Sequence, residues 1–176
     1  MIDVHVLVMD YTPREWVEQC RDSIDVAIER AGFPVFAHFI PGIPGHIGKA
    51  RAAGYSLGSQ PYATYVDDDD YMLPDGFRVL KAALESGAPA IYGRELQLQN
   101  GHLRPHSGRH NLMVTRRDRL IDCAAWKGCP DIVQRKTEGI DVLEPGYVYR
   151  VREGSKGRAL ARACSDEYRR AHEWQT

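Results

Sequence analysis

Four consecutive aspartates, Asp67 to Asp70, are the side chains in this sequence with the clearest capacity for chemistry. They directly follow a strand-like run, Ala63-Thr64-Tyr65-Val66. Carboxylates held this close repel one another unless a cation or protons neutralise them. Oxygen ligands suit Mg²⁺ or Mn²⁺, and these ions usually accompany phosphates. The cluster therefore predicts a metal site for a nucleotide diphosphate. The alternative, a solvated acidic loop, is less favoured because the cluster stands at a strand end, where open α/β sheets bind ligands.

The composition indicates a single globular domain. The chain has 176 residues, of which 43% are hydrophobic and 27% charged, and this length allows a core without disulfides. A net charge of −1 gives no indication of nucleic-acid binding. No apolar run is long enough to span a membrane, and the first residues do not resemble a signal peptide. We therefore expect a soluble, cytoplasmic protein. The four cysteines match no zinc spacing, and Cys20 is predicted to lie in the core.

The first half of the chain alternates between strand and helix patterns. Strands are predicted at 4–9, 35–40 and 63–66, with helices at 13–32, 47–57 and from Pro74 onward. Thr12 and Glu15 form the pattern of a capping box for the first helix, and Gly32 is predicted to end it. This order is typical of an α/β fold with a mainly parallel sheet flanked by helices.

The second half has a different pattern. A strand is predicted at 89–93, and residues 96–104 form a hairpin pattern around Asn100-Gly101. Further strands are predicted at 110–115 and 142–151, with helices at 131–138 and 158–174. We expect one domain over 1–176, in which 1–87 bind the nucleotide and 88–176 provide the acceptor and catalytic half.

Four motifs, in this order, resemble family 2 glycosyltransferases with the GT-A fold. The segment Tyr65-Val66-Asp67-Asp68-Asp69-Asp70-Tyr71-Met72-Leu73-Pro74 resembles the family's strand–DxDD–x₃–Pro segment. Upstream, Asp10-Tyr11-Thr12-Pro13-Arg14-Glu15 is similar to its start, and Gly48-Lys49-Ala50-Arg51-Ala52-Ala53-Gly54 to its "G…ARN.G" helix. Val148-Tyr149-Arg150-Val151 resembles its late "Y-Y-R-V" strand. The similarity spans most of the chain.

This resemblance implies transfer of a sugar from a nucleotide-diphosphate sugar to a hydroxyl acceptor, with Mn²⁺ or Mg²⁺ as cofactor. Asp69 corresponds to the direct metal ligand, and Asp67 lies near the ribose or a metal-bound water. Asp70 is placed toward the acceptor or holds the loop. A nucleotide site is also implied for Tyr11, which approaches the base, and for Arg51 and Lys49, which meet nucleotide or phosphate charge. For Arg51 the alternative is an ordinary surface charge.

The sequence departs from the family at two functional positions. Phe39-Ile40-Pro41-Gly42 stands where the family usually has the acidic motif that contacts uracil, so the base that this chain prefers is open. The late acidic pair, which serves inverting members as catalytic base, is reduced to Asp131. Asp131 is therefore the predicted base. A helix-start residue that complements the helix dipole is an equal alternative for it.

Three histidines, His102, His106 and His110, are spaced four apart. Gly101 and Pro105 make a helix unfavourable there, so a three-histidine zinc site is not expected, although one histidine can approach the metal or acceptor from a loop. Two rival functions remain. One is a metal-dependent nucleotidyltransferase or phosphohydrolase, and the other is a non-catalytic nucleotide-sugar-binding module. Because the chain is short for the family, we expect a partner chain, a second copy or a large acceptor to complete the acceptor platform.

Overall fold

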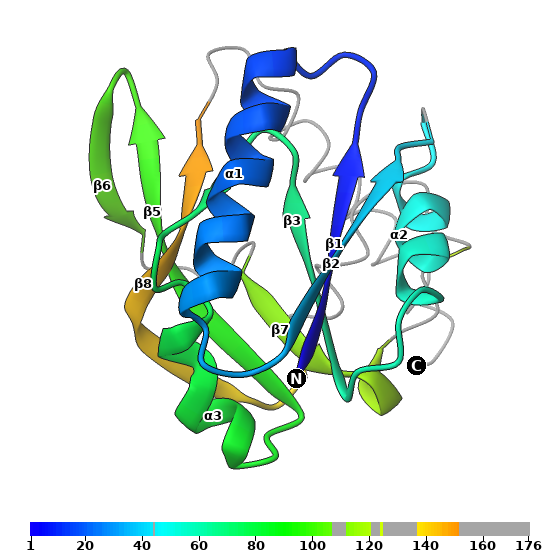
Figure 1. The fold of residues 1–176 in the computed structure, drawn as a ribbon, viewed down its shortest axis with the longest axis vertical. Coiled ribbons are helices and arrows are strands. Elements are labelled where there is room, and N and C mark those ends of the chain that lie inside the picture. Colours follow the sequence, from blue (N-terminus) through cyan, green and yellow to red (C-terminus); the bar gives the residue numbers. More distant parts are fainter. Residues whose placement is uncertain (44, 107–111, 121–123, 125–136, 152–176) are drawn as a thin grey trace, which may run out of the picture.

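The computed structural model describes residues 1–43, 45–106, 112–120, 124 and 137–151. Its helices and strands alternate in the first half, as predicted, and strands dominate the second half (Figure 1). Their bounds, in chain order, are β1 (Ile2–Val8), α1 (Arg14–Arg30), β2 (Val35–Pro41), α2 (Ile47–Tyr55), β3 (Tyr62–Asp67), β4 (Tyr71–Met72), η1 (Arg78–Leu80), α3 (Lys81–Glu85), β5 (Ala90–Gln99), β6 (His102–His106), β7 (Met113–Arg116), η2 (Arg117–Arg119) and β8 (Ile140–Arg150).

The first three strands form a parallel unit in the order β2-β1-β3. Val4 and Val6 of β1 pack with Cys20 of α1, so α1 covers one face of this unit. His5, which lies between these two valines, points to the other face, where the centre of its ring lies 5.5 Å from that of Tyr55 in α2. After β1 the chain adds β2 on one side of β1 and then crosses back to add β3 on the other side. Between β1 and β3 lies the switch point at which open α/β sheets bind ligands.

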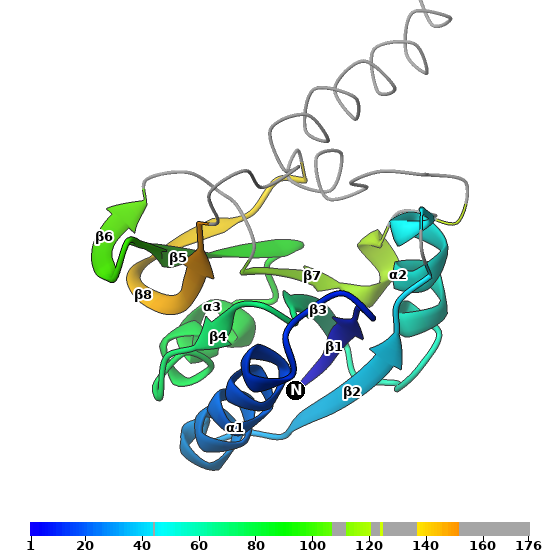
Figure 2. The ribbon, with the colours of Figure 1, turned by 90° about the horizontal axis from the view of Figure 1, so that it is seen from above.

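The remaining strands make the sheet mixed. Its order is β2-β1-β3-β7-β5-β8-β4, and β6 pairs with β5 at the side. Among the described strands, β5–β8 is parallel, whereas β3–β7, β5–β7, β5–β6 and β4–β8 are antiparallel. The prediction of a mainly parallel sheet is therefore not confirmed. Figure 2 shows the sheet curling from β2 to β8, with α1 and α3 on the same side of it.

The ends of two local elements were predicted with different success. Pro13, and not Thr12, is the N-cap of α1, and no side chain caps the helix there. The predicted capping box is therefore wrong. Gly32 does follow the helix with a φ of 71°, a conformation that glycine adopts without steric cost. Asn100 and Gly101 have φ values of 50° and 76°, as expected for the tight β5–β6 hairpin.

One other predicted helix begins later than expected, and two lie mostly or wholly outside the described residues. The helix expected from Pro74 begins only with η1 and α3. The helices expected at 131–138 and 158–174 lie mostly or wholly outside the described residues. No helix in the described part of the chain is long and apolar enough to cross a membrane.

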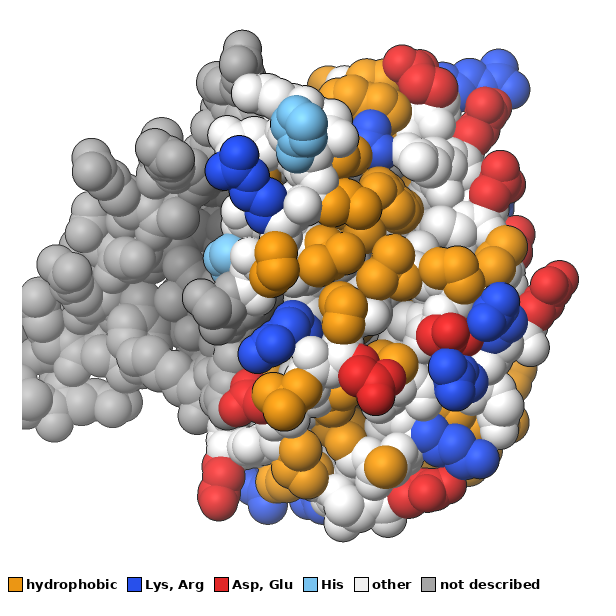
Figure 3. Space-filling view, turned by 90° about the vertical axis from the view of Figure 1, so that its left-hand side faces the viewer, with side chains coloured by type: hydrophobic (Ala, Val, Ile, Leu, Met, Phe, Trp, Pro, Cys, Tyr) orange, Lys and Arg blue, Asp and Glu red, His pale blue; other side chains and the backbone are white. Residues whose placement is uncertain are grey.

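The core lies mainly between the sheet and α1. Cys20, predicted to be a core residue, is fully buried there together with Ile24. A smaller cluster on the other face contains Tyr65 and Tyr92. Figure 3 shows the side formed by β6, β5 and β8, where hydrophobic side chains gather over the middle and charged ones lie around them. Leu103 of β6 and Leu143 of β8 are 51% and 69% exposed.

Candidate metal and nucleotide site

The four aspartates form the turn that connects β3 to β4, at the carboxyl end of β3. Asp67 is the last residue of the strand, and the amide of Asp70 donates a hydrogen bond of 3.1 Å to its carbonyl. Burial divides the four into two pairs. Asp68 and Asp70 are 4% and 1% exposed, whereas Asp67 and Asp69 are only partly buried. The alternation leaves Asp67 and Asp69 as the two carboxylates that can meet a ligand from solvent.

Asp68 connects the aspartate turn to the end of β1. Its Oδ2 accepts a hydrogen bond of 2.7 Å from the amide of Met9, the residue that follows β1. Within the sheet, Leu7 of β1 is the register partner of Asp67. Asp68 thus holds the two loops that follow β1 and β3 together at the switch point. The segment that contains Tyr11 is one of these loops, and the Tyr11 side chain is 67% exposed.

Asp70 connects the same turn to β8. Its Oδ2 accepts a hydrogen bond of 2.6 Å from the Tyr147 hydroxyl, and its Oδ1 accepts one of 2.7 Å from the amide of Arg150. Burial, together with the charges of Asp69 and Asp67, raises the pKa of Asp70 well above its usual value. Both oxygens of Asp70 thus face protein donors. This placement favours the second of its two predicted roles, that of holding the loop.

Arg51 faces the site from α2, on the side of the sheet opposite α1. It is 7% exposed, and its guanidinium lies 3.7 Å from the centre of the Tyr65 ring. Its Nη2 is 3.6 Å from Oδ1 of Asp67, so the structure brings together two of the predicted site residues. An arginine in this position can bind phosphate oxygens that approach Asp67.

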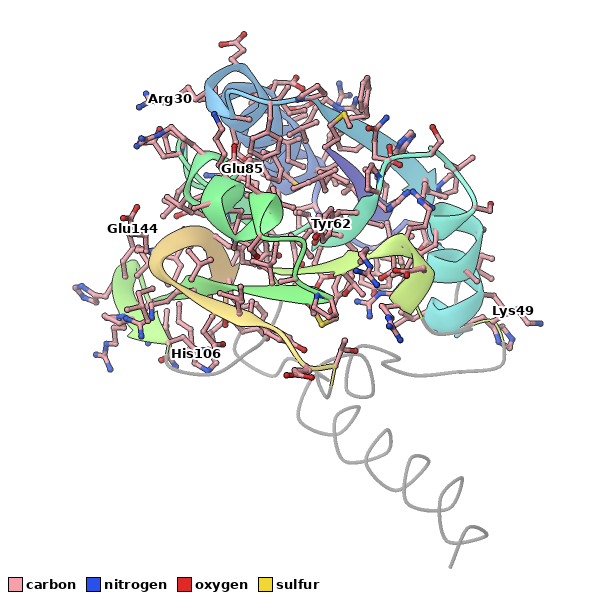
Figure 4. The ribbon with its side chains drawn as sticks, turned by 90° about the horizontal axis from the view of Figure 1, so that it is seen from below. Arg30, Lys49, Tyr62, Glu85, His106 and Glu144 are labelled. Carbon is pink, nitrogen blue, oxygen red and sulfur yellow. The ribbon has the colours of Figure 1, made fainter. Side chains whose placement is uncertain are left out.

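The structure shows no contact between the other predicted site residues and the aspartate turn among the described residues. Lys49 is exposed, and Figure 4 shows it at the outer side of α2, pointing away from the sheet. Asp131, the predicted base, lies outside the described residues, as does His110. His102 and His106 belong to β6, in accord with the expectation that this segment is not a helix.

Tyr147 was not singled out from the sequence, and Arg150 was named only as a member of the late strand motif. Tyr147 contacts Asp70, and its hydroxyl lies 3.4 Å from the amide nitrogen of Asp67. Arg150 packs its guanidinium 4.4 Å from the centre of the Trp16 ring in α1. The late strand motif that ends in Val151 pointed to this part of the chain. It could not show that the partner of that strand is the aspartate turn.

The arrangement of Asp67 and Asp69 fits a divalent ion that shares its coordination with a substrate. Mg²⁺ and Mn²⁺ sites of this kind use one or two carboxylates together with water and phosphate oxygens. Within the described ranges, no group of three or more His, Cys, Asp or Glu side chains could hold a metal ion. Two carboxylates beside an arginine match the one or two carboxylates of an ion that shares its coordination with phosphate oxygens.

Comparison with solved structures finds the same fold in proteins of low sequence identity. S. aureus TarS 1-349 aligns with a TM-score of 0.63 and 12% identity, over 85% of this chain and 60% of that chain. The same protein in complex with UDP-GlcNAc gives a TM-score of 0.60 and 12% identity, over 88% and 59%. Rv0371C from Mycobacterium tuberculosis H37Rv, in complex with manganese, gives 0.50 and 11%, over 90% and 96%.

These similarities establish a shared fold. The chain covers 60% or less of the TarS chains that it matches. No protein-family model and no curated protein sequence matches the chain. The comparisons therefore place the aspartate turn in a known mixed α/β architecture, and any conclusion about its chemistry depends on the residues of this chain.

Proposed function

We propose that this protein transfers a sugar from a nucleotide-diphosphate sugar to a hydroxyl acceptor, with Mn²⁺ or Mg²⁺ as cofactor. One observation carries the proposal: Asp67 and Asp69 are the more open pair of the aspartate turn, at the switch point and beside Arg51. The family resemblance of the sequence supports it. So does the fold shared with a protein whose structure holds UDP-GlcNAc.

The residues of the chain then have separate tasks. Asp69 and Asp67 hold the ion, which when bound offsets the diphosphate charge and stabilises the leaving nucleotide. Arg51 binds phosphate oxygens on the α2 side, while Asp68 and Asp70 keep the turn in place through Met9 and Tyr147. Because these partners are backbone and buried groups, the open carboxylates are fixed before the donor binds, which lowers the ordering cost of binding.

Three further assignments are extended from the sequence. Tyr11, exposed in the loop after β1, is proposed to stack on the base. Lys49 is proposed to provide positive charge at the rim of the phosphate site. Asp131 is proposed as the base that removes the acceptor proton during inversion. The acceptor half of the site is proposed to be completed by the acceptor itself, a partner chain or a second copy.

Thermal unfolding with nucleotide sugars tests this proposal. A ligand that binds only the native state stabilises it by mass action. UDP-GlcNAc with Mn²⁺ is expected to raise the melting temperature more than either component alone, and incubation should release UDP. A panel of other nucleotide sugars covers the open choice of base. Release of pyrophosphate from a nucleoside triphosphate would instead favour a nucleotidyltransferase, and binding without any turnover would favour a non-catalytic module.

A further inference from the structure

One face of α1 lies against the aspartate turn and the end of β8. Its side chains are spaced three or four positions apart, as neighbours on a helix surface are. We call it the support face and define it by Trp16, Gln19, Cys20 and Ser23. Cys20 also belongs to the core, whereas Gln19 is exposed, so this face runs from the core to the surface.

Ser23 connects the support face to β4, the strand that follows the aspartate turn. Its Oγ accepts a hydrogen bond of 3.0 Å from the amide of Met72 and donates one of 2.7 Å to the carbonyl of Cys20. The amide of the next residue, Leu73, bonds to the Gly146 carbonyl, and amides alternate in direction along a strand. The Met72 amide therefore points away from β8 and toward α1, where Ser23 supplies its acceptor.

Cys20 contacts the other end of the turn. Its Sγ donates a weak hydrogen bond of 3.6 Å to the carbonyl of Asp67, the last residue of β3. The support face thus meets the chain where the turn begins, at Asp67, and where it ends, at Met72 of β4. Asp69 lies between these two points. Both proposed ion ligands are therefore carried by a segment that is attached at each end to the same helix.

Gln19 and Trp16 attach the end of β8 to the support face, and Figure 1 shows this strand ending beside α1. The guanidinium of Arg150 donates a hydrogen bond of 2.5 Å to Oε1 of Gln19 and lies 4.4 Å from the centre of the Trp16 ring. It also lies 5.9 Å from the ring of Tyr71, the residue after Asp70. Aromatic rings attract a cation at these distances. Because the amide of Arg150 binds Asp70, this residue links α1, β8 and the turn.

We propose that the support face of α1 positions the aspartate turn, and that Ser23 and Arg150 are positioning residues for metal-dependent donor binding. This inference rests on the proposed function and adds two residues that act through Asp67 and Asp69. An ion such as Mg²⁺ needs its oxygen ligands in nearly ideal octahedral geometry. A turn that has been loosened must be ordered again when the ion and the diphosphate bind, which weakens binding. Binding of UDP without the ion does not carry this cost.

The test compares Ser23→Ala with Ser86→Ala. The Ser86 hydroxyl also donates to the carbonyl three residues earlier, that of Ala83 in α3. Both variants therefore lose a bond of this kind, and Ser23→Ala in addition removes the acceptor of the Met72 amide. UDP is titrated calorimetrically with MnCl₂ and with EDTA, at a temperature where each variant is folded.

The gain in UDP affinity that Mn²⁺ provides should fall about tenfold in Ser23→Ala, the lower end of what a residue supporting metal ligands contributes. UDP affinity in EDTA should change less than about twofold. Ser86→Ala should match the wild type in both titrations.

Ser23→Thr and Arg150→Met separate positioning from folding. Threonine keeps the hydroxyl and can bond to the same carbonyl within a helix, so Ser23→Thr should recover most of the Mn²⁺-dependent gain. Arg150→Met keeps the amide that binds Asp70 but loses the guanidinium. It should also reduce the gain, and it decides the test if Ser23→Ala does not fold.

A Mn²⁺-dependent gain in Ser23→Ala equal to that of the wild type overturns the inference, even if the melting temperature falls, because Ser23 then has a structural role alone. An equal loss in Ser86→Ala overturns it, as does a Ser23→Thr variant as weak as Ser23→Ala. An unchanged gain in Arg150→Met overturns the part assigned to that residue. If the wild type binds UDP no better with Mn²⁺ than with EDTA, the proposed function itself fails.

Discussion

Asp68 and Asp70 are buried beside two other carboxylates, and both burial and like charge penalise an ionised side chain. The structure meets this penalty with donors: the Met9 amide for Asp68, and Tyr147 and the Arg150 amide for Asp70. The same residue type therefore has two tasks within four positions. The partly buried pair, Asp67 and Asp69, is the proposed ion site, and the buried pair holds the turn.

At this scale, Asp70→Asn is predicted to change how stability depends on pH. The pKa of Asp70 is raised in the folded state by burial and by Asp69 and Asp67. Its contribution is therefore complete below the unfolded pKa, and it is lost as pH rises through the folded pKa. Asparagine cannot ionise, so urea unfolding of the metal-free variant should lack this loss as pH rises from the unfolded pKa to the raised folded pKa.

Asp70→Ala is the matched comparison, because alanine removes the acceptor as well as the charge. The buried Tyr147 hydroxyl and the partly buried Arg150 amide then lose their partner, which should cost about 1–3 kcal/mol for the Tyr147 hydroxyl alone. If Asp70→Asn shows the same pH slope as the wild type, the ionised carboxylate of Asp70 is not the cause of that slope.

Among the elements, β1 carries an anchor at each end. At its carboxyl end Met9 joins the aspartate turn, and at its amino end Asp3, 1% exposed, collects three donors. These are His38 Nε2 at 3.0 Å, the amide of Gln60 at 2.8 Å and Arg117 Nη2 at 2.6 Å. Asp3 thereby joins β1 to β2, to the loop before β3 and to η2, and fixes the parallel unit whose other end forms the site.

Asp3→Asn is accordingly predicted to lower the free energy of unfolding by roughly 3 kcal/mol, because Arg117 loses a buried partner. Burial alone would raise the pKa of Asp3, but the hydrogen bonds from His38, Gln60 and Arg117 outweigh it and lower that pKa. The stabilisation is present above the unfolded pKa and is lost as pH falls through the folded pKa. The free energy of unfolding of Asp3→Asn should therefore lack this decrease as pH falls.

Asp75→Asn provides the control for Asp3, since Asp75 also pairs with arginines but at the surface. Surface ion pairs contribute little, so its urea midpoint should stay near that of the wild type. Equal midpoints for Asp3→Asn and Asp75→Asn would contradict the role given to Asp3 as an anchor of β1.

The loop after β2 is the basis of a second prediction at the scale of elements, which concerns selectivity for the nucleotide base. Pro41 and Gly42 stand where the resembling family places an acid for uracil, and a site without a buried polar partner cannot strongly reject a wrong base. Affinities for uridine, guanosine and cytidine diphosphates in competition assays should therefore differ by less than about a thousandfold, or some 4 kcal/mol. A larger preference would show that another polar group reads the base.

At the scale of the whole molecule, local sequence patterns predicted the helices and strands better than they predicted which strands pair. Valine-rich runs and helical periodicity gave the strands and helices up to β3, and Asn100-Gly101 gave the hairpin. The mixed sheet was not predicted, because the direction of β7 and β8 depends on partners that lie far away in sequence. The contact of Tyr147 with Asp70 across 77 positions is of the same kind. Thr12 does not cap α1, since the N-cap residue of this helix is Pro13.

The division of the aspartates could not be predicted either. Four identical side chains carry no signal of which will be buried, and only the fold of the turn between β3 and β4 separates them. From the strand end and the count of carboxylates, the sequence predicts an ion and diphosphate site at this turn, and this stays a prediction. The residues after Val151 and the segment with Asp131 lie outside the described residues, so the predicted base stays a prediction.

Calorimetric titration of UDP into the wild type and Asp69→Asn, each with Mn²⁺ and with EDTA, tests the central claim most directly. We predict that Mn²⁺ strengthens UDP binding to the wild type and that Asp69→Asn loses this increment, because one ligand charge of the ion is gone. The melting temperature should not fall, since the change also relieves repulsion within the turn. The same Mn²⁺-dependent gain in affinity for the wild type and Asp69→Asn would contradict the account.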